Sequence, residues 1–227
     1  MIVKKVIHYK EALKFGFNTF VDNFFLFLKA TLIFAALIIG VLTAIAGIPA
    51  FLWLLFTKQS GKDIPFLLRL LYGGIIGLAF SLVTSYFSAN FTRVSLALYE
   101  GKTVTLSDFF TISMSNLFRY FVAIFLYGFK VLLGTFLLVI PGLYIWVKYA
   151  FTGYFILEED ASISQDQDLN SHLTYGVKWK LLWFNWFLYI LEFACSAGVI
   201  TMILYPAFIL VHTHVYKQLR SFENIKG

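Results

Sequence analysis

Ionisable residues inside long apolar stretches are the first candidates for chemistry in this sequence. Lys130 and Lys148 stand in two consecutive apolar stretches, and Glu192 stands in a third. A charge near the centre of a bilayer costs at least about 2.5 to 3.5 kcal/mol, so such a residue needs a partner or a polar cavity. Three hypotheses stay open: a buried ion pair, with Lys130 and Glu192 within reach of each other; lysines that extend to an interface; or a polar pathway lined by all three residues.

The sequence lacks the common motifs of soluble enzymes. It has no G-x-S-x-G elbow, phosphate-binding loop, dinucleotide fingerprint or H-E-x-x-H motif. His212 and His214 point about 200° apart on a helix, which argues against a shared metal. The acidic residues from Glu158 to Asp168 lack the spacing of a calcium loop. We therefore expect no enzyme activity, no metal and no cofactor.

The composition of the chain excludes an ordinary soluble protein. Of its 227 residues 60% are hydrophobic and only 13% are charged, against about 25% charged in soluble domains. Its mean hydropathy is +0.81. The 18 Lys and Arg residues outnumber the 12 Asp and Glu residues, but they flank apolar stretches, so they predict membrane topology rather than nucleic-acid binding.

The fold class that this pattern predicts is all-α, a polytopic transmembrane helical bundle. A span needs roughly 20 apolar residues. With that measure, residues 1–227 form a single membrane domain of about six spans, arranged as helical hairpins. The spans are predicted at about 24–46, 70–92, 117–139, 143–157, 181–204 and 207–216. Short amphipathic helices are predicted to lie at the interface at about 8–22 and 165–178.

Proline and small residues indicate where the hairpins turn and how the helices pack. Turns are predicted at Pro49, at Pro141 with Gly142, and at Pro206. The amphipathic and apolar segments that precede these three turns form a weak repeat. In the second span a small residue recurs every four positions, which favours close helix packing; these residues are Gly73, Gly77, Ser81, Ser85 and Ala89. Ser88 and Asn90 of the same span suggest a hydrated groove.

Trp179, Trp183 and Trp186 lie on one side of the predicted fifth span, as an aromatic anchor at the membrane interface would. With both ends inside, most Lys and Arg residues fall on the inner side, and only Lys58, Lys62 and Arg69 fall outside. We therefore expect a multi-pass protein of the cytoplasmic (inner) membrane with both termini cytoplasmic.

A family resemblance rests on residues 140–183. This stretch contains PGLYIWVKYAF from Pro141, ILEEDASI from Ile156 and SHLTYGVKWKLL from Ser171. It resembles bacterial inner-membrane proteins of the YciC type and the membrane domain attached to some glycerophosphodiester phosphodiesterases. The resemblance implies six helices without an assigned chemistry. The chain departs from this pattern at Asp166, Asp168 and Asn170.

Two functions are consistent with these patterns. The first is a non-enzymatic component of a membrane complex that binds lipids, another membrane subunit or a second copy of itself. The second is a transporter of a small molecule or lipid, with a polar path lined by Lys130, Lys148 and Glu192. Nucleic acid is not an expected partner.

Overall fold

The computed structural model describes residues 5–47, 50–51, 53–55, 66–194 and 199–224, and these residues form helices without any strand. The elements in chain order are α1 (Tyr9–Asp22), α2 (Phe24–Leu42), the π-helical turn η1 (Thr43–Gly47), α4 (Phe66–Tyr99), the 3-10 turn η2 (Leu106–Phe110), α5 (Met114–Leu137), α6 (Val139–Lys148), α7 (Tyr154–Glu159), α8 (Ile163–Leu173), α9 (Lys178–Ala194) and α10 (Val199–Asn224). The predicted all-α class is therefore confirmed.

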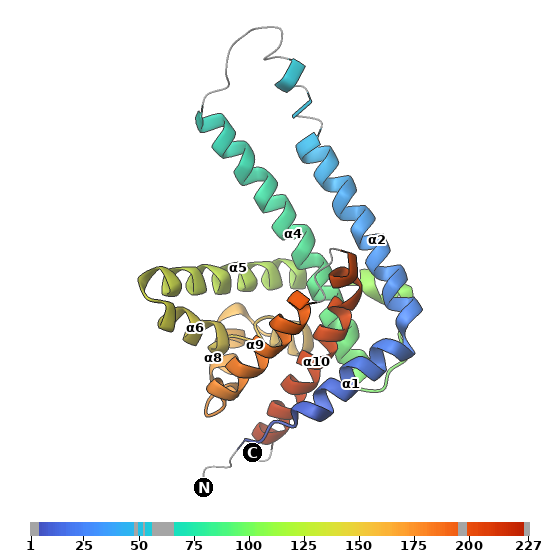
Figure 1. Cartoon of the computed structure of the whole chain (residues 1–227), viewed down its shortest axis with the longest axis vertical. Helices are drawn as coiled ribbons and strands as arrows, with labels where there is room; N and C mark the ends of the chain where they lie inside the picture. The colour runs from blue at the N-terminus through green and yellow to red at the C-terminus, as the bar shows by residue number, and fades with distance from the viewer. Residues whose placement is uncertain (1–4, 48–49, 52, 56–65, 195–198, 225–227) are drawn as a thin grey trace.

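Three helical stretches are long and apolar enough to cross a membrane, namely Phe24–Ile45, Leu68–Tyr99 and Met114–Leu137. They match the first three predicted spans closely. Helices α2 and α4 extend side by side from the main body of the protein. Helix α5 extends in another direction, and α6 folds back beside it (Figure 1). The full set of six spans stays a prediction.

The predicted fourth span, 143–157, is not one helix. Helix α6 ends at Lys148 and α7 begins at Tyr154, with turns between them. A row of polar side chains on α8 supports this break. Asn170 accepts a hydrogen bond from Phe151 N (3.1 Å) and donates to Phe151 O (3.1 Å), while Asp166 accepts from Gly153 N (3.0 Å). Since these contacts satisfy buried backbone groups, the chain leaves the helix without an unpaired amide.

Pro206 does not form the predicted turn. It lies inside α10, which is helical from Val199 to Asn224, and α9 ends at Ala194 rather than near residue 204. Residues 206–211 are all buried in the described structure. Packing against neighbouring helices holds this stretch helical, although proline supplies no backbone N–H.

The α5–α6 turn is displaced from its predicted position at Pro141 and Gly142. The break is at Leu138, whose backbone is extended (φ −162°, ψ 142°). Pro141 therefore lies in the first turn of α6, where a missing N–H leaves no hydrogen bond unmade. Gly142 lies against Thr135, so its role is close packing within the hairpin. Pro49 lies outside the described residues.

Aromatic rings fill the junction where α2 and α4 enter the main body. Phe27, Phe91 and Phe109 contact one another with ring centroids 4.8 to 6.1 Å apart, and Phe34 lies 5.7 Å from Phe91. All four side chains are at most 1% exposed. The buried part of α2 ends at Phe34. The stability of the outer halves of α2 and α4 therefore depends on what surrounds them rather than on this aromatic core.

Helix α1 packs along α10. A methyl group added at Gly16 would lie 2.3 Å from Val211 Cγ2 and 2.9 Å from Val211 N, so only glycine allows this approach. His8 N also donates to Gln218 Oε1 at 3.0 Å. The beginning and the end of the described chain therefore lie together on one side of the molecule (Figure 1).

Charged residues join α4, α7 and α10 near that side. Lys217 Nζ lies 2.9 Å from Glu100 Oε1 and 2.5 Å from Glu158 Oε1, and Tyr216 donates to the other oxygen of Glu158 at 2.5 Å. The Lys217 side chain is only 14% exposed. Removal of one member of a largely buried pair leaves its partner uncompensated.

We expect Lys217→Met to lower the free energy of unfolding by about 2 kcal/mol, because Glu158 would stay buried without its cation. Lys102→Met is the matched control, since Lys102 pairs with the same Glu100 at 2.6 Å but is 66% exposed. An exposed pair is worth at most about 1 kcal/mol. Thermal melting of both detergent-solubilised variants measures the difference, and equal melting temperatures would contradict the role of Lys217.

Candidate functional site

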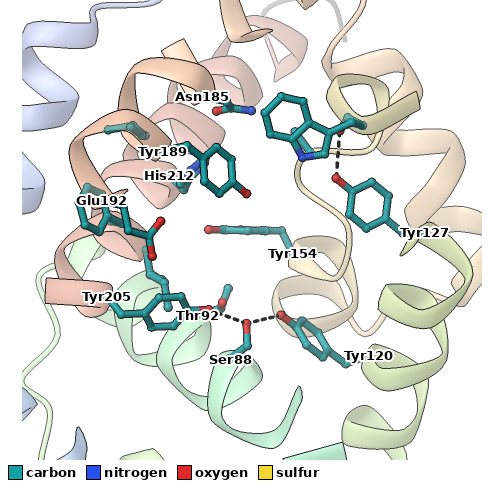
Figure 2. Close-up of a pocket in the computed structure, with 15 residues that line it drawn as sticks. Ser88, Thr92, Tyr120, Tyr127, Tyr154, Asn185, Tyr189, Glu192, Tyr205 and His212 are labelled. Carbon is teal, nitrogen blue, oxygen red and sulfur yellow. Dashed lines mark hydrogen bonds between the residues drawn. The ribbon is translucent and has the colours of Figure 1, made fainter. Parts of the chain in front are cut away.

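A cavity of about 290 Å³ lies among α4, α5, α9 and α10, and is completed by the end of α6, the start of α7 and the segment that joins them. Its polar and aromatic lining comprises Ser88, Thr92, Tyr120, Tyr127, Trp146, Tyr154, Asn185, Tyr189, Glu192, Tyr205 and His212. Ala150, Leu188, Phe208 and Ile209 complete it. Figure 2 shows these side chains converging from opposite sides on one space.

Glu192 is the only carboxylate of the lining, and no lysine or arginine stands among the described residues that form the cavity. Its carboxylate points into the space between Tyr154, Tyr189 and Tyr205 (Figure 2). Glu192 and Tyr189 also reach the molecular surface, so the cavity is open on the side of α9. The cavity therefore offers a negative charge within an aromatic wall.

Hydroxyl groups line the floor of the cavity. Ser88 Oγ lies 2.9 Å from Tyr120 Oη, and Tyr205 Oη donates to Ser88 Oγ at 3.3 Å (Figure 2). On another side, Tyr154 Oη lies 3.4 Å from Thr213 Oγ1, which lies 2.5 Å from Ser95 Oγ. These bonds fix the orientation of three tyrosine rings, so the wall is formed before any ligand arrives.

Trp146 and Tyr189 form the aromatic edge of the cavity. Their ring centroids are 5.4 Å apart, and Tyr127 Oη donates to Trp146 O at 3.1 Å. Tyrosine and tryptophan rings carry negative potential on their faces, which attracts cations. Ring faces and a carboxylate in one small space are the chemistry of organic-cation recognition.

The structure does not bring Lys130 and Lys148 to this cavity. Lys130 Nζ donates to Gln167 Oε1 at 2.6 Å, and the ammonium groups of Lys130 and Lys148 lie 5.2 and 4.9 Å from the centre of the Tyr149 ring. The ion pair between Lys130 and Glu192 is therefore not formed. Of the three residues, only Glu192 lines a polar space, because α9 turns it toward α4 and α10.

The small-residue row of α4 divides into two halves. Ser85 is 5% exposed and Ala89 is fully buried. At Gly73 and Gly77, however, no described atom beyond the adjoining backbone of α4 lies within 4 Å of an added Cβ, and Ser81 is half-buried. Among the described residues, it is therefore the inner half of the row, Ser85 and Ala89, that packs closely. Ser88 lines the cavity described above, whereas Asn90 donates to Tyr86 O (2.9 Å) and does not line it.

The two neighbouring histidines have separate surroundings. His212 lines the cavity, whereas His214 packs between Phe15 and Tyr99, with ring centroids 5.0 and 5.4 Å apart. Among the described residues no cluster of three metal-ligating side chains occurs. The acids near α7 bind protein groups instead: Glu158 binds Lys217 and Tyr216, and Asp160 binds Arg119.

The aromatic lining of the cavity is not predicted from the sequence, although the sequence contains one signal for it. Asn185, Tyr189 and Glu192 are spaced four and three residues apart, and Ser88 and Thr92 are spaced four apart. Such spacings place side chains on one helix face. Two polar helix faces within apolar stretches are the pattern that predicts a shared polar cavity.

Comparison with protein-family models, curated proteins and solved structures finds no match to this chain. The resemblance carried by residues 140–183 therefore stays a prediction, and function rests on the geometry of the cavity.

Proposed function

We propose that this chain is a non-enzymatic integral membrane protein that binds a small organic cation, or the amine head of an amphiphile, in the cavity around Glu192. The observation that carries the proposal is the lining itself: one carboxylate faces aromatic rings, and no lysine or arginine is among the described residues that line the cavity. Aromatic rings around an ammonium group stabilise it by up to about 2 kcal/mol when water is excluded.

The size and the polarity of the cavity support a small ligand. A volume of about 290 Å³ is just below the range of roughly 300 to 1,000 Å³ for small-molecule sites. Ser88, Asn185 and the tyrosine hydroxyls supply hydrogen-bonding groups for a polar substituent. An alkylammonium group that carries a hydroxyl satisfies both requirements.

Choline and its uncharged analogue 3,3-dimethylbutanol are suitable probes, because they share shape and hydroxyl group and differ in charge. In calorimetry of the protein in maltoside detergent, we expect the protein to bind choline and to discriminate against the analogue. Glu192→Gln should weaken choline binding at least tenfold, since the ammonium group loses its counter-charge. Asp168→Asn removes an exposed acid of α8 and should leave the affinity unchanged.

Two outcomes would refute the proposal. Equal affinity for both probes would mean that charge is not recognised, and an unchanged affinity in Glu192→Gln would place the cation elsewhere. Tyr205→Phe is a second variant, because it keeps the ring while it removes the hydrogen bond to Ser88. It should retain most of the choline affinity.

Transport is the second candidate function. Glu192, which is predicted to line a path, and Ser88, where a groove is predicted, both line this cavity. Uptake of radiolabelled choline into proteoliposomes, lost in Glu192→Gln, would distinguish transport from binding alone.

The proposed location is the cytoplasmic membrane, crossed several times, with both termini on the cytoplasmic side. It is supported by the contact between His8 and Gln218, which joins the two ends of the described chain. The exposed basic residues Lys10, Lys14 and Lys102 add to this support, because such residues are retained on the cytoplasmic side.

A further inference from the structure

A second hollow, separate from the cavity around Glu192, lies between α6 and the start of α9. Its volume is about 590 Å³, and its walls are mainly apolar. Ile140, Leu143 and Val147 of α6 form one wall, and Val177 and Leu182 form the other. We call this hollow the α6–α9 groove.

The rim of the α6–α9 groove is cationic. Lys178 and Lys180 both line it, and no acidic residue is among the described residues that do. Lys178 Nζ forms no ion pair with a carboxylate of the described residues; it donates to Tyr144 Oη at 2.6 Å and lies 4.2 Å from the centre of that ring. Tyr144 thereby holds the ammonium group at the mouth of the groove. Lys180 is exposed and forms no ion pair with any described residue.

Exposed aromatic residues surround this rim, as they do at the level of lipid headgroups in membrane proteins. Trp179 and Tyr175, both in the lining, are 73% and 74% exposed, and Trp183 follows one turn later at 68%. Tryptophan and tyrosine gather where the hydrocarbon meets the headgroups. From the rim the groove leads to the α5–α6 turn, where Phe136, Leu137 and Ile140 are each at least 74% exposed. A polar mouth therefore continues into an apolar surface.

We propose that the α6–α9 groove binds one anionic phospholipid. Its phosphate lies between Lys178 and Lys180, and one acyl chain follows the apolar walls toward the α5–α6 turn. Charge complementarity selects the ligand, because two lysines without an opposing acid favour a headgroup with net negative charge over a zwitterionic one. The apolar walls favour a lipid over free phosphate. This inference does not depend on cation binding at Glu192.

The test uses the full chain in maltoside detergent, titrated with phosphatidylglycerol or with phosphatidylcholine of the same acyl chains. Native mass spectrometry counts the lipids that stay bound. We expect a tightly bound phosphatidylglycerol, and a preference over phosphatidylcholine that falls at least tenfold in the variant Lys178→Gln/Lys180→Gln. Lys10→Gln/Lys14→Gln is the matched control, since it removes two exposed charges from α1 and should leave the preference unchanged.

Lys180→Gln alone covers the case in which the double variant does not fold, because Lys180 is exposed and makes no ion pair within the described chain. It should lower the preference for phosphatidylglycerol by several fold, and added salt should lower it in the wild type as well. An equal loss in the α1 control would mean general charge attraction rather than this groove. Equal binding of the two lipids, or tight binding of inorganic phosphate alone, would also overturn the inference. Choline binding measured on the same variants should stay intact, which separates the two sites.

Discussion

Gly142→Ala is expected to open the α5–α6 hairpin and to lower the free energy of unfolding by about 3 kcal/mol. The added methyl carbon would lie 2.1 Å from Thr135 Oγ1, 2.7 Å from Thr135 N and 2.8 Å from Thr135 Cα. Two of these atoms are backbone, so a rotamer change cannot relieve the overlap. Overpacking of this kind costs typically about 1 to 3 kcal/mol. Thermal melting followed by tryptophan fluorescence should show a clear decrease in melting temperature.

Gly77→Ala is the matched control for this experiment. The substitution is chemically identical and also lies in an apolar helix, but apart from the adjoining backbone of its own helix no described atom lies within 4 Å of the new methyl group. Alanine is favoured over glycine within a helix by up to about 1 kcal/mol, so Gly77→Ala should melt at the wild-type temperature or slightly above it. If both variants melted alike, the close contact between Gly142 and Thr135 would not be a feature of the folded protein.

A pH-dependent stability is the second large effect that we expect, and it comes from Asp166 on α8. Burial raises the pKa of Asp166 from 3.8 to about 7, although backbone N–H groups of Gly153, Phe155 and Ile156 act in the opposite direction. Between about pH 4 and pH 7 the folded protein therefore keeps a proton that the unfolded chain has lost. The free energy of unfolding should decrease as the pH rises through this window, by up to about 4 kcal/mol in all. It should level off above about pH 7.

Asp166→Asn should remove this dependence. An amide in place of the carboxyl keeps the oxygen that accepts from Gly153 N at 3.0 Å, but it carries no charge at any pH. The difference in melting temperature between variant and wild type, measured at several pH values, isolates this one group. Asp168→Asn serves as the control because Asp168 is exposed two residues away. A difference curve for Asp166→Asn that is flat from pH 4 to pH 8 would show that the carboxyl is not buried as described.

The first three predicted spans show what local composition can determine. Residues 24–46 were predicted as one span and form α2 with η1, because nearly every residue there is apolar and helix satisfies the backbone without outside partners. These properties depend only on residues that are close to one another along the chain. Trp179 and Trp183 of α9 are exposed, and their role as a membrane anchor stays a prediction.

The structure differs from the predictions where residues far apart in the sequence contact one another. Pro206 reads as a turn, yet packing against the other helices keeps α10 continuous there. Residues 143–157 read as a span, yet Asn170 and Asp166 hold the backbone at Phe151 and Gly153 in a break. Hydropathy contains no information about either contact.

The candidate site was predictable only in part. The sequence marked Glu192 as a residue that needs a polar surrounding, since a lone carboxylate in an apolar stretch cannot stay unsolvated. It could not show that Tyr120, Tyr154 and Tyr205 supply that surrounding, nor that Lys130 binds Gln167.

The sequence by itself determined the class of the protein, an all-helical chain with apolar stretches long enough to cross a membrane, because hydrophobicity and helix length are local quantities. Three of these stretches are long apolar helices in the structure. Only the tertiary structure decided which charged residue faces a cavity, where the helices break and which glycines permit close contact. Those features depend on which helix faces meet, and that is a property of packing in three dimensions.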